Sequence, residues 1–247
     1  MNDKKIEQLK SFIDESKNIV FFGGAGVSTE SNIPDFRSSD GLFSRQLNQH
    51  FSPEELVSHT FYKRYPEDFF KFYKENMIYP NAKPNKAHLA LARLEAQGKL
   101  KAVITQNIDG LHQKAGSKTV YELHGTVNSN TCEQCSAQYN LDEFLKLPGL
   151  VPHCSECGAR VKPDVVLYGE SLNEDTIVNS INAISKADML IVGGTSLVVY
   201  PAAGFLSYFS GKYLVLINKS STMMDKDANL IINDSIGSVL DKTINDI

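Results

Sequence analysis

The sequence has no hydrophobic run long enough to span a membrane, so an integral membrane protein is not expected. Its first ten residues, M-N-D-K-K-I-E-Q-L-K, contain acidic side chains and no apolar core, which is unlike a secretory signal. We therefore expect a cytoplasmic protein that does not bind a membrane.

The chain also lacks an excess of positive charge. It has 25 Lys and Arg residues against 29 Asp and Glu residues, for a net charge of −4 at pH 7. A protein with this balance is not expected to have nucleic acid as its main partner. With 247 residues, of which 42% are hydrophobic and 22% charged, it has the composition of a globular domain with room for a modest insertion.

Cysteine is scarce, and its placement is informative. The four cysteines form two C-x-x-C pairs, Cys132 with Cys135 and Cys154 with Cys157. Disulfides are not expected in the cytoplasm. The spacing is typical of a zinc site in which four thiolates complete a tetrahedron, leaving no open position for catalysis. Four unrelated buried cysteines are the alternative, but every cysteine of the chain belongs to the pattern.

Short apolar runs alternate with helical patterns along the chain. Most of these runs are apolar throughout, as in strands buried on both faces of a parallel sheet. An amphipathic helix is predicted over residues 85–97. The layout predicts an α/β fold with a doubly wound, Rossmann-like parallel sheet. The predicted strands are residues 18–22, 101–106, 119–124, 164–168, 188–192, 213–217 and 229–232.

Two segments interrupt this alternation and predict a smaller domain. Residues 38–85 form an aromatic-rich helical module, and residues 127–164 form a zinc-ribbon module. The larger, Rossmann-like domain then comprises residues 1–37, 86–126 and 165–247. The aromatic side chains of the helical module are more typical of a domain core than of a ligand site.

A glycine turn follows the first predicted strand, and a helix is expected after it. Gly24 and Gly26 match the start of a dinucleotide-binding fingerprint, but Thr29 replaces its third glycine. The amides of such a turn suit a pyrophosphate. The sequence P-D-F-R at residues 34–37 is not one that a hydride-transferring dehydrogenase needs.

Polar residues follow the other predicted strands, where an open parallel sheet binds its ligands. Helix capping would explain one of Gln106, Asn107 and Asp109, but not easily all three. His124 could be structural if taken alone, but beside the other strand ends it suits acid–base chemistry. Further small or polar residues at strand ends are Gly194, Thr195, Ser196, Asn218 and Lys219. Together they could enclose a whole dinucleotide.

In order and spacing, these motifs resemble the sirtuins, the NAD-dependent protein-lysine deacylases, in the form of a bacterial-type minimal catalytic core. The resemblance extends from Ile19 to Leu240. It rests on G-A-G-V-S (24–28), I-P-D-F-R (33–37), Q-N-I-D-G-L-H (106–112), H-G (124–125), both cysteine pairs, V-L-Y-G-E (166–170), G-T-S (194–196) and I-N-K (217–219). Asn32 stands where the family usually has glycine, and asparagine tolerates the left-handed backbone that such a turn needs.

The resemblance implies an enzyme that cleaves the nicotinamide–ribose bond of NAD and transfers the lysine acyl group to ADP-ribose. One structural Zn²⁺ is implied as well. His124 would be the general base, with Asn107 and Asp109 also catalytic. The implied NAD contacts are Gly24, Ala25, Gly26, Thr29, Phe36, Arg37, Gln106, Asn107, Ile108, Asp109, Gly194, Thr195, Ser196, Asn218, Lys219 and Ile236.

The resemblance also implies the substrate site. Phe36, with Val166, Leu167, Tyr168, Gly169 and Glu170, would hold an acyl-lysine peptide, whose backbone would pair with this segment as an added strand. Family members that prefer acidic acyl chains carry Tyr-x-x-Arg, whereas residues 73–76 read Y-K-E-N. We therefore expect neutral acyl groups, acetyl first, and a monomeric enzyme.

Two other functions remain open at this point. A mono-ADP-ribosyltransferase could use the same site with a different acceptor, although it would have less need of His124. A non-catalytic, NAD-sensing zinc module is the second alternative. A nucleic-acid role for the cysteine pairs is disfavoured by the acidic balance of the chain.

Overall fold

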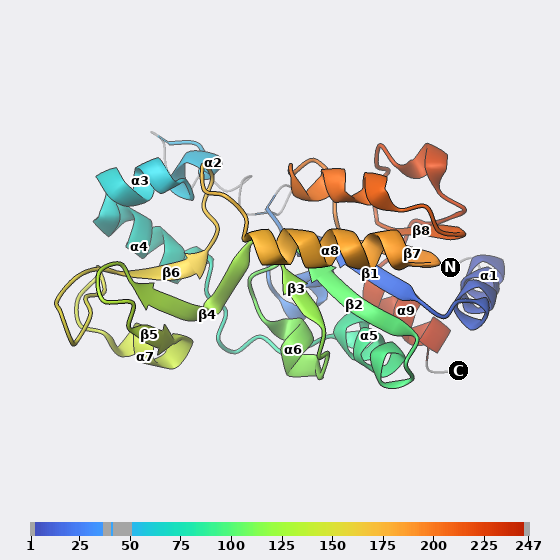
Figure 1. Ribbon diagram of the computed structural model, residues 1–247, viewed down its shortest axis with the longest axis horizontal. Coiled ribbons are helices and arrows are strands. Elements are labelled where there is room, and N and C mark those ends of the chain that lie inside the picture. Colours follow the sequence, from blue (N-terminus) through green and yellow to red (C-terminus); the bar gives the residue numbers. More distant parts are fainter. Residues whose placement is uncertain (1–2, 37–40, 42–50, 245–247) are drawn as a thin grey trace.

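The computed structural model describes residues 3–36, 41 and 51–244. Its larger sheet has six parallel strands in the order β3-β2-β1-β7-β8-β9, as a doubly wound fold requires (Figure 1). Every residue of the three central strands, β1, β7 and β8, is buried, which explains their uniformly apolar sequences. The strands are β1 (Ile19–Gly23), β2 (Leu100–Thr105), β3 (Val120–Glu122), β7 (Met189–Gly193), β8 (Tyr213–Ile217) and β9 (Leu230–Ile232).

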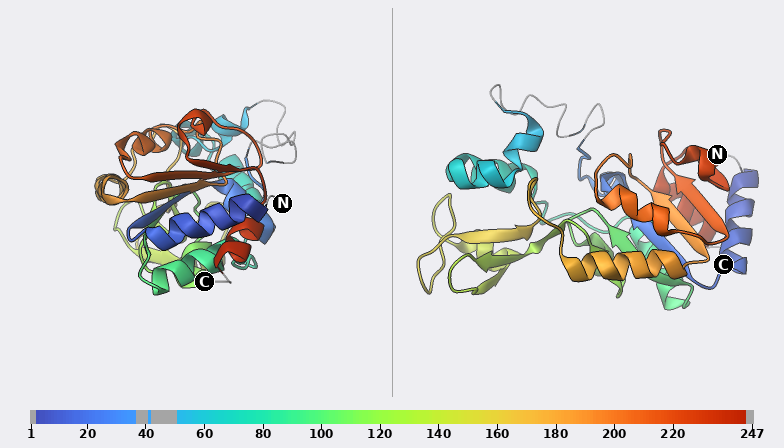
Figure 2. Two further views of the ribbon diagram at one scale, coloured as in Figure 1. Left: turned by 90° about the vertical axis from the view of Figure 1, so that its right-hand side faces the viewer. Right: turned by 45° about the horizontal axis from the view of Figure 1, so that its top comes forward.

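Helices cover both faces of this sheet (Figure 2, left). Because successive strand residues point to opposite faces, Ile19 and Phe21 of β1 lie in one hydrophobic cluster and Val20 and Phe22 in another. The first cluster is completed by α1 (Asp3–Glu15), α5 (Lys86–Ala96) and α9 (Ile236–Ile244). The second is completed by α8 (Glu174–Lys186) and the 3₁₀ helix η4 (Ala202–Tyr208). The short helix α6 (Leu111–Ala115) follows β2.

A second sheet of three antiparallel strands, in the order β5-β4-β6, lies beside the first (Figures 1 and 2). Its core is aromatic: Phe69, Phe70, Tyr73 and Phe144 are fully buried and in mutual ring contact. Phe61, Tyr62 and Phe72 are buried as well, so the described aromatic residues of the helical segment are mostly core residues, as expected, whereas Tyr65 is exposed. The elements are β4 (Gly125–Cys132), β5 (Gln138–Asn140), β6 (Val161–Val165), α2 (Pro53–Leu56), α3 (His59–Arg64), α4 (Pro66–Asn76) and α7 (Leu141–Lys146).

Two local predictions were wrong. The strand expected at residues 164–168 is β6, at 161–165, and it pairs antiparallel with β4 instead of joining the parallel sheet. The glycine turn leads into two 3₁₀ turns, η1 (Ala25–Val27) and η2 (Thr29–Ser31), and not into an α-helix. Asn32 ends η2 with φ 62°, the left-handed conformation expected of it.

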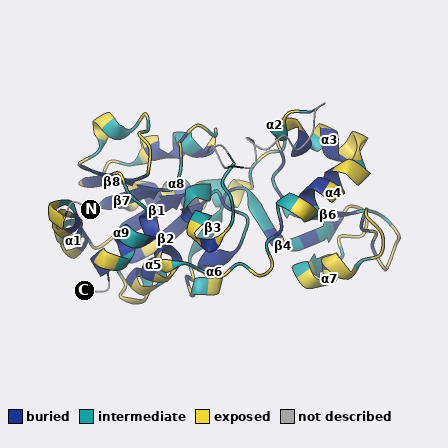
Figure 3. Cartoon of the chain, turned by 180° about the vertical axis from the view of Figure 1, so that it is seen from behind, coloured by how far each residue is buried: buried dark blue, intermediate teal, exposed yellow. Residues whose placement is uncertain are grey.

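The burial pattern agrees with this division, with dark strands enclosed by helices whose outer faces are exposed (Figure 3). A last 3₁₀ turn, η5 (Asp225–Asp227), precedes β9. Within the described part of the chain, none of the helices combines the length and the apolar character that crossing a membrane would require.

Candidate functional site

The carboxyl ends of the central strands are level with one another. Gly23, at the end of β1, is in register with Gly193 of β7 and with Thr105 of β2, and Gly193 is in register with Ile217 of β8. The residues that follow these strands therefore meet at one edge of the sheet. The structure brings the predicted glycine turn, Gln106, Gly194 and Asn218 together there, as the sequence suggested.

The glycine turn packs directly against the loop after β7. The Gly26 amide donates to the Gly194 carbonyl over 2.8 Å, and the Gly24 amide donates to the Gly193 carbonyl over 3.3 Å. A Cβ on Gly26 would lie 2.8 Å from the Gly194 Cα, which is closer than real Cβ atoms approach. Backbone contact between the two loops thus requires glycine here. Thr29 Oγ1 donates to the Gly26 carbonyl over 3.0 Å and holds the end of the turn.

A polar network joins this turn to the loop after β2. Ser28 is buried; its Oγ donates to Asp109 Oδ2 over 2.6 Å and accepts from Asn107 Nδ2 over 3.1 Å. Asp109 Oδ1 accepts the Leu111 amide over 2.9 Å, at the start of α6. We assigned no separate role to Ser28 from the sequence, although it belongs to the G-A-G-V-S motif. Only its contact across 81 residues reveals that it links the two loops.

A second network lies on the β7–β8 side of the edge. Gln106 Nε2 donates to Thr195 Oγ1 over 3.1 Å, and the Thr195 amide donates to Asn218 Oδ1 over 3.0 Å. Asn218 is buried, yet its Nδ2 has no hydrogen-bond partner among the described residues. A buried donor is costly unless it is paired, so this amide fits a ligand acceptor such as a ribose oxygen. Ser196 and Lys219 are exposed beside this network.

The other predicted cofactor residues are placed differently. Ile236 is buried at the start of α9, and its side chain packs against the backbone of Gly193, below the carboxyl end of β7. Ala25, Ile108 and Phe36 are half-buried. Arg37 lies outside the described residues.

His124 stands in the turn between β3 and β4. Its Nδ1 lies 2.9 Å from the Gln106 carbonyl oxygen, which can only accept, so Nδ1 carries the hydrogen and Nε2 carries the lone pair. Burial lowers the pKa of His124 below its ordinary value of 6.5, although the hydrogen bond to Gln106 opposes this shift. The imidazole is therefore a neutral base at neutral pH, with its tautomer set by the backbone.

The predicted substrate segment is held from within the molecule. Glu170 Oε2 accepts the Leu167 amide over 2.9 Å and Lys162 Nζ over 3.2 Å, and Glu170 Oε1 lies 2.8 Å from His59 Nδ1. Burial alone would raise the pKa of Glu170, but these partners hold it below its usual range. Glu170 thus shapes the loop, and its carboxylate is occupied by intramolecular bonds.

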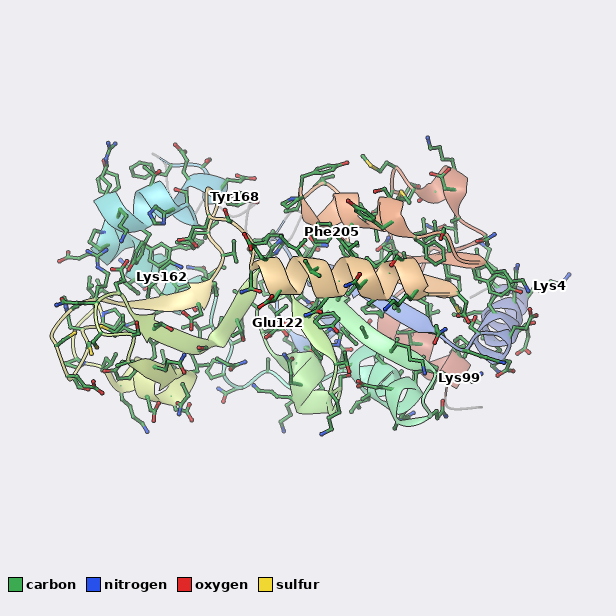
Figure 4. The ribbon with its side chains drawn as sticks, viewed as in Figure 1. Lys4, Lys99, Glu122, Lys162, Tyr168 and Phe205 are labelled. Atoms are coloured by element: carbon green, nitrogen blue, oxygen red, sulfur yellow. The ribbon has the colours of Figure 1, made fainter. Side chains whose placement is uncertain are left out.

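The Tyr168 backbone also has intramolecular partners, while its side chain is exposed between the two sheets (Figure 4). Its amide donates to the Val57 carbonyl over 3.0 Å, and its carbonyl accepts the His59 amide over 2.9 Å. A peptide strand cannot pair with these two groups while they are so bonded. Val166 is half-buried, Leu167 is buried, and Gly169 is exposed with φ 88°.

The four cysteine sulfurs lie within 4.8 Å of one another. Cys132 and Cys157 are 3.4 Å apart at Sγ, and Cys135 and Cys154 are 3.6 Å apart. A zinc ion with Zn–S bonds of about 2.3 Å requires sulfurs about 3.8 Å apart, so the four residues fit Zn²⁺. His153 Nδ1 bonds to the Gly158 carbonyl over 2.9 Å, in keeping with a site that is complete with four sulfurs.

This combination of a parallel sheet, a glycine turn and polar groups at the carboxyl edge defines a nucleotide-binding α/β protein with a zinc-binding insertion. The chain belongs to the Sir2 family, whose model matches residues 24–201. The resemblance found in the sequence is therefore confirmed.

Similar proteins extend over the whole chain. An NAD-dependent protein deacetylase of Clostridium perfringens (strain 13 / Type A) is 64% identical over 243 residues, covering 98% of this chain and 99% of the relative. One of Clostridium acetobutylicum is 59% identical over 240 residues, covering 97% and 98%. A solved Sir2 structure with a p53 peptide and NAD⁺ has a TM-score of 0.86 at 38% identity, covering 98% of both chains. A Sir2 variant with deacetylated p53 peptide and 3′-O-acetyl ADP-ribose has a TM-score of 0.90 at 38% identity and the same coverage.

Proposed function

We propose that the protein is an NAD-dependent protein-lysine deacetylase. It cleaves nicotinamide from NAD and transfers the acetyl group of a lysine to ADP-ribose, giving free lysine, nicotinamide and O-acetyl-ADP-ribose. The observation that carries this proposal is His124, a neutral base held by Gln106 at the same sheet edge as the glycine turn. The relatives and solved structures of the Sir2 family support the same activity.

The residues of the site divide between binding and proton transfer. NAD, as co-substrate, supplies the bond that breaks and the ADP-ribose that accepts the acetyl group. Because the Gly24 and Gly26 amides already donate to the Gly193 and Gly194 carbonyls, the phosphates would contact other groups of this turn, at Ala25 and Thr29. Asn218 suits a ribose oxygen. His124 Nε2 would take the proton of a ribose hydroxyl. Asn107 and Asp109, joined through Ser28, would fix the loop that borders this ribose.

We further propose that the acyl group is neutral. Solved Sir2 structures of 37% and 38% identity carry an acetylated and a propionylated peptide. In this chain Tyr73 is 1% exposed within the aromatic core, and Lys74 Nζ lies 3.0 Å from the Leu150 carbonyl. Lys74 is thus directed to the loop at Leu150, and Asn76 stands where an acidic acyl chain would need an arginine. Acetyl and propionyl peptides should be turned over, and succinyl peptides should react at least tenfold more slowly.

The acyl-lysine peptide is proposed to lie along residues 166–170, with Phe36 on its other side. Since the Tyr168 amide and carbonyl bond to Val57 and His59, strand pairing would have to use other main-chain groups of this segment. The exposure of the Tyr168 side chain supports a contact with the peptide.

The wider organisation also rests on proposals. The larger domain would comprise residues 1–37, 86–126 and 165–247, and the helical and zinc modules, at 38–85 and 127–164, would form the smaller one. The separate hydrophobic cluster around Phe69 and Phe144 supports this division. The cytoplasmic location and the monomeric state expected from the sequence stay predictions.

Mass spectrometry tests the function directly. The purified protein is incubated with NAD and an acetyl-lysine peptide, and each is omitted in turn. Deacetylated peptide and O-acetyl-ADP-ribose, formed only when both are present, are the expected products. Mass added to a protein acceptor would instead indicate an ADP-ribosyltransferase, and NAD binding without turnover would indicate a sensor.

A further inference from the structure

Glu30, on the 3₁₀ turn η2, reaches α9 at the far end of the chain. Its Oε1 accepts the Gly237 amide over 2.8 Å, across 207 residues. Gly237 is the second residue of α9, so its amide is among the helix donors that have no partner within the helix. A carboxylate at this end also complements the helix dipole. Glu30 therefore caps α9 from a distance.

The same turn is held from its other side by Asn85, at the start of α5. Asn85 Nδ2 donates to the Val27 carbonyl over 2.8 Å and to Ser31 Oγ over 3.0 Å. Its Oδ1 accepts the Ala87 amide over 2.9 Å and caps α5. One side chain thus fixes both the helix and residues 27–31.

A third contact joins the two helices next to Glu30. Lys86, the residue after Asn85, places its Nζ 2.8 Å from Asp241 Oδ2 on α9. The Glu30 charge also acts on Lys86 and contributes to raising its pKa, after the larger effect of Asp241. The turn is therefore held against α5 and α9 together.

Residues 27–31 carry Ser28 and Thr29, which the proposed function places in the cofactor site. Ser28 Oγ bonds to Asp109, while Ile236, next to Gly237, lies beneath Gly193. A shift of the turn against α9 would disturb both the Ser28–Asp109 contact and the packing of Ile236 against Gly193. The contact of Glu30 is with α9 and not with the strand ends, so its effect on the cofactor site would be indirect.

We propose that Glu30 and Asn85 are positioning residues that hold the 27–31 turn in its NAD-binding geometry by tying it to the first turns of α9 and α5. The inference rests on the proposed function only in naming NAD as the ligand. The alternative is that both residues serve folding alone.

The primary test is Glu30→Ala, measured by the KM for NAD and by calorimetric titration with ADP-ribose. We expect the KM for NAD to rise about fivefold, kcat and the KM for peptide to change less than twofold, and ADP-ribose affinity to fall about as much as the KM for NAD rises. Glu30→Gln keeps an acceptor oxygen and should restore most of the affinity. An unchanged ADP-ribose affinity in Glu30→Ala would overturn the proposal.

Gly237→Ala tests the contact from its other end. A Cβ on Gly237 would lie 2.5 Å from Glu30 Oε2 and 2.8 Å from Oε1, so the carboxylate must move away. This variant should weaken NAD binding as Glu30→Ala does, and the double variant should be no weaker than either single one. Fully additive losses would show that the two residues act separately.

Asn85→Asp separates positioning from folding. The aspartate keeps an oxygen for the Ala87 amide but loses the donor to Val27 and Ser31. The lost donor and the new carboxylate oxygen near the Val27 carbonyl should lower the melting temperature as well as the ADP-ribose affinity. The affinity is therefore measured at a temperature at which circular dichroism shows the variant to be folded, and a lower melting temperature with unchanged affinity would support folding alone. Glu174→Ala, which removes an exposed glutamate from the first turn of α8, is the matched control and should bind ADP-ribose normally.

The binding readout keeps this inference separate from the proposed function. If the unmodified protein binds ADP-ribose but shows no deacetylation, the proposed function fails. The variants then still test whether Glu30 and Asn85 position the 27–31 turn. If it deacetylates peptide and the variants bind ADP-ribose normally, the proposed function stands, and the positioning role of Glu30 and Asn85 is rejected.

Discussion

The Gln106 carbonyl oxygen accepts a hydrogen bond from His124 Nδ1, and the Gln106 side chain donates to Thr195. One residue at the end of β2 therefore fixes the tautomer of the base and also contacts the β7 loop. Gln106 thereby holds the base and the loop after β7 in a fixed relative position. The turn at His124 is brought beside β2 because β3, which precedes it, pairs with β2.

Replacing the base should abolish turnover while leaving cofactor binding. We expect His124→Ala to lower kcat by about 10²- to 10⁴-fold, because Nε2 is the proposed proton acceptor. Calorimetric titration with ADP-ribose should give an affinity close to that of the unmodified protein. Wild-type turnover in this variant would rule out His124 as the base.

The pH dependence should reflect the lowered pKa of His124. The base acts when neutral, and its pKa lies below 6.5 because of burial. The acid limb of kcat/KM should therefore have its midpoint below pH 6.5, with nearly constant activity between that pH and 8. The profile is measured with enzyme that remains folded at each pH, as checked by circular dichroism. A midpoint near pH 7 or higher would contradict this assignment.

Loss of a zinc ligand should destabilise the small sheet. Cys132 ends β4, and its sulfur lies 3.4 Å from that of Cys157. Cys132→Ser should lower the zinc content, measured by elemental mass spectrometry, and lower the melting temperature by roughly 6–12 °C, as expected for a loss of about 3 kcal/mol. Removing zinc from the unmodified protein with a chelator should have a similar effect. A zinc-free protein with an unchanged melting temperature would show that the four cysteines are not a structural metal site.

A methyl group at Gly26 should push the glycine turn after β1 away from the loop after β7, which contains Gly194. Its Cβ would lie 2.8 Å from the Gly194 Cα, and backbone atoms on both sides can move little. Gly26→Ala should cost about 1–3 kcal/mol of folding stability and weaken ADP-ribose binding. Gly204→Ala is the matched control, because its nearest neighbour, in the Tyr200 ring, would be 3.7 Å from the new Cβ. Equal effects of the two substitutions would argue against a role for the close approach at Gly26.

The sequence was informative where chemistry is local. The apolar runs at β1, β7 and β8 predicted buried strands because a strand covered on both faces excludes polar side chains. The two C-x-x-C pairs predicted a metal site because four thiols at that spacing can reach one ion, and the structure gathers their sulfurs. Glycine at 24 and 26 indicated a turn suited to a pyrophosphate, but it did not reveal that this turn packs against the backbone of Gly194.

Sequence patterns could not place residues 161–168. The run D-V-V-L-Y has the composition of a parallel strand, but residues 161–165 pair with β4, and the Tyr168 amide then bonds to Val57. Strand propensity does not distinguish one sheet from another, since pairing depends on partners that are distant along the chain.

The sequence by itself determined the fold class, the family and the residue types at each strand end, because periodicity, glycine spacing and cysteine spacing are properties of short segments. Only the tertiary structure decided which of these residues act together. The tautomer of His124, the Ser28 bridge to Asp109 and the tie from Glu30 to Gly237 each join segments far apart in the chain. Such contacts form because burial in one folded molecule makes each unpaired polar group costly, and that cost is set by neighbours that no local pattern identifies.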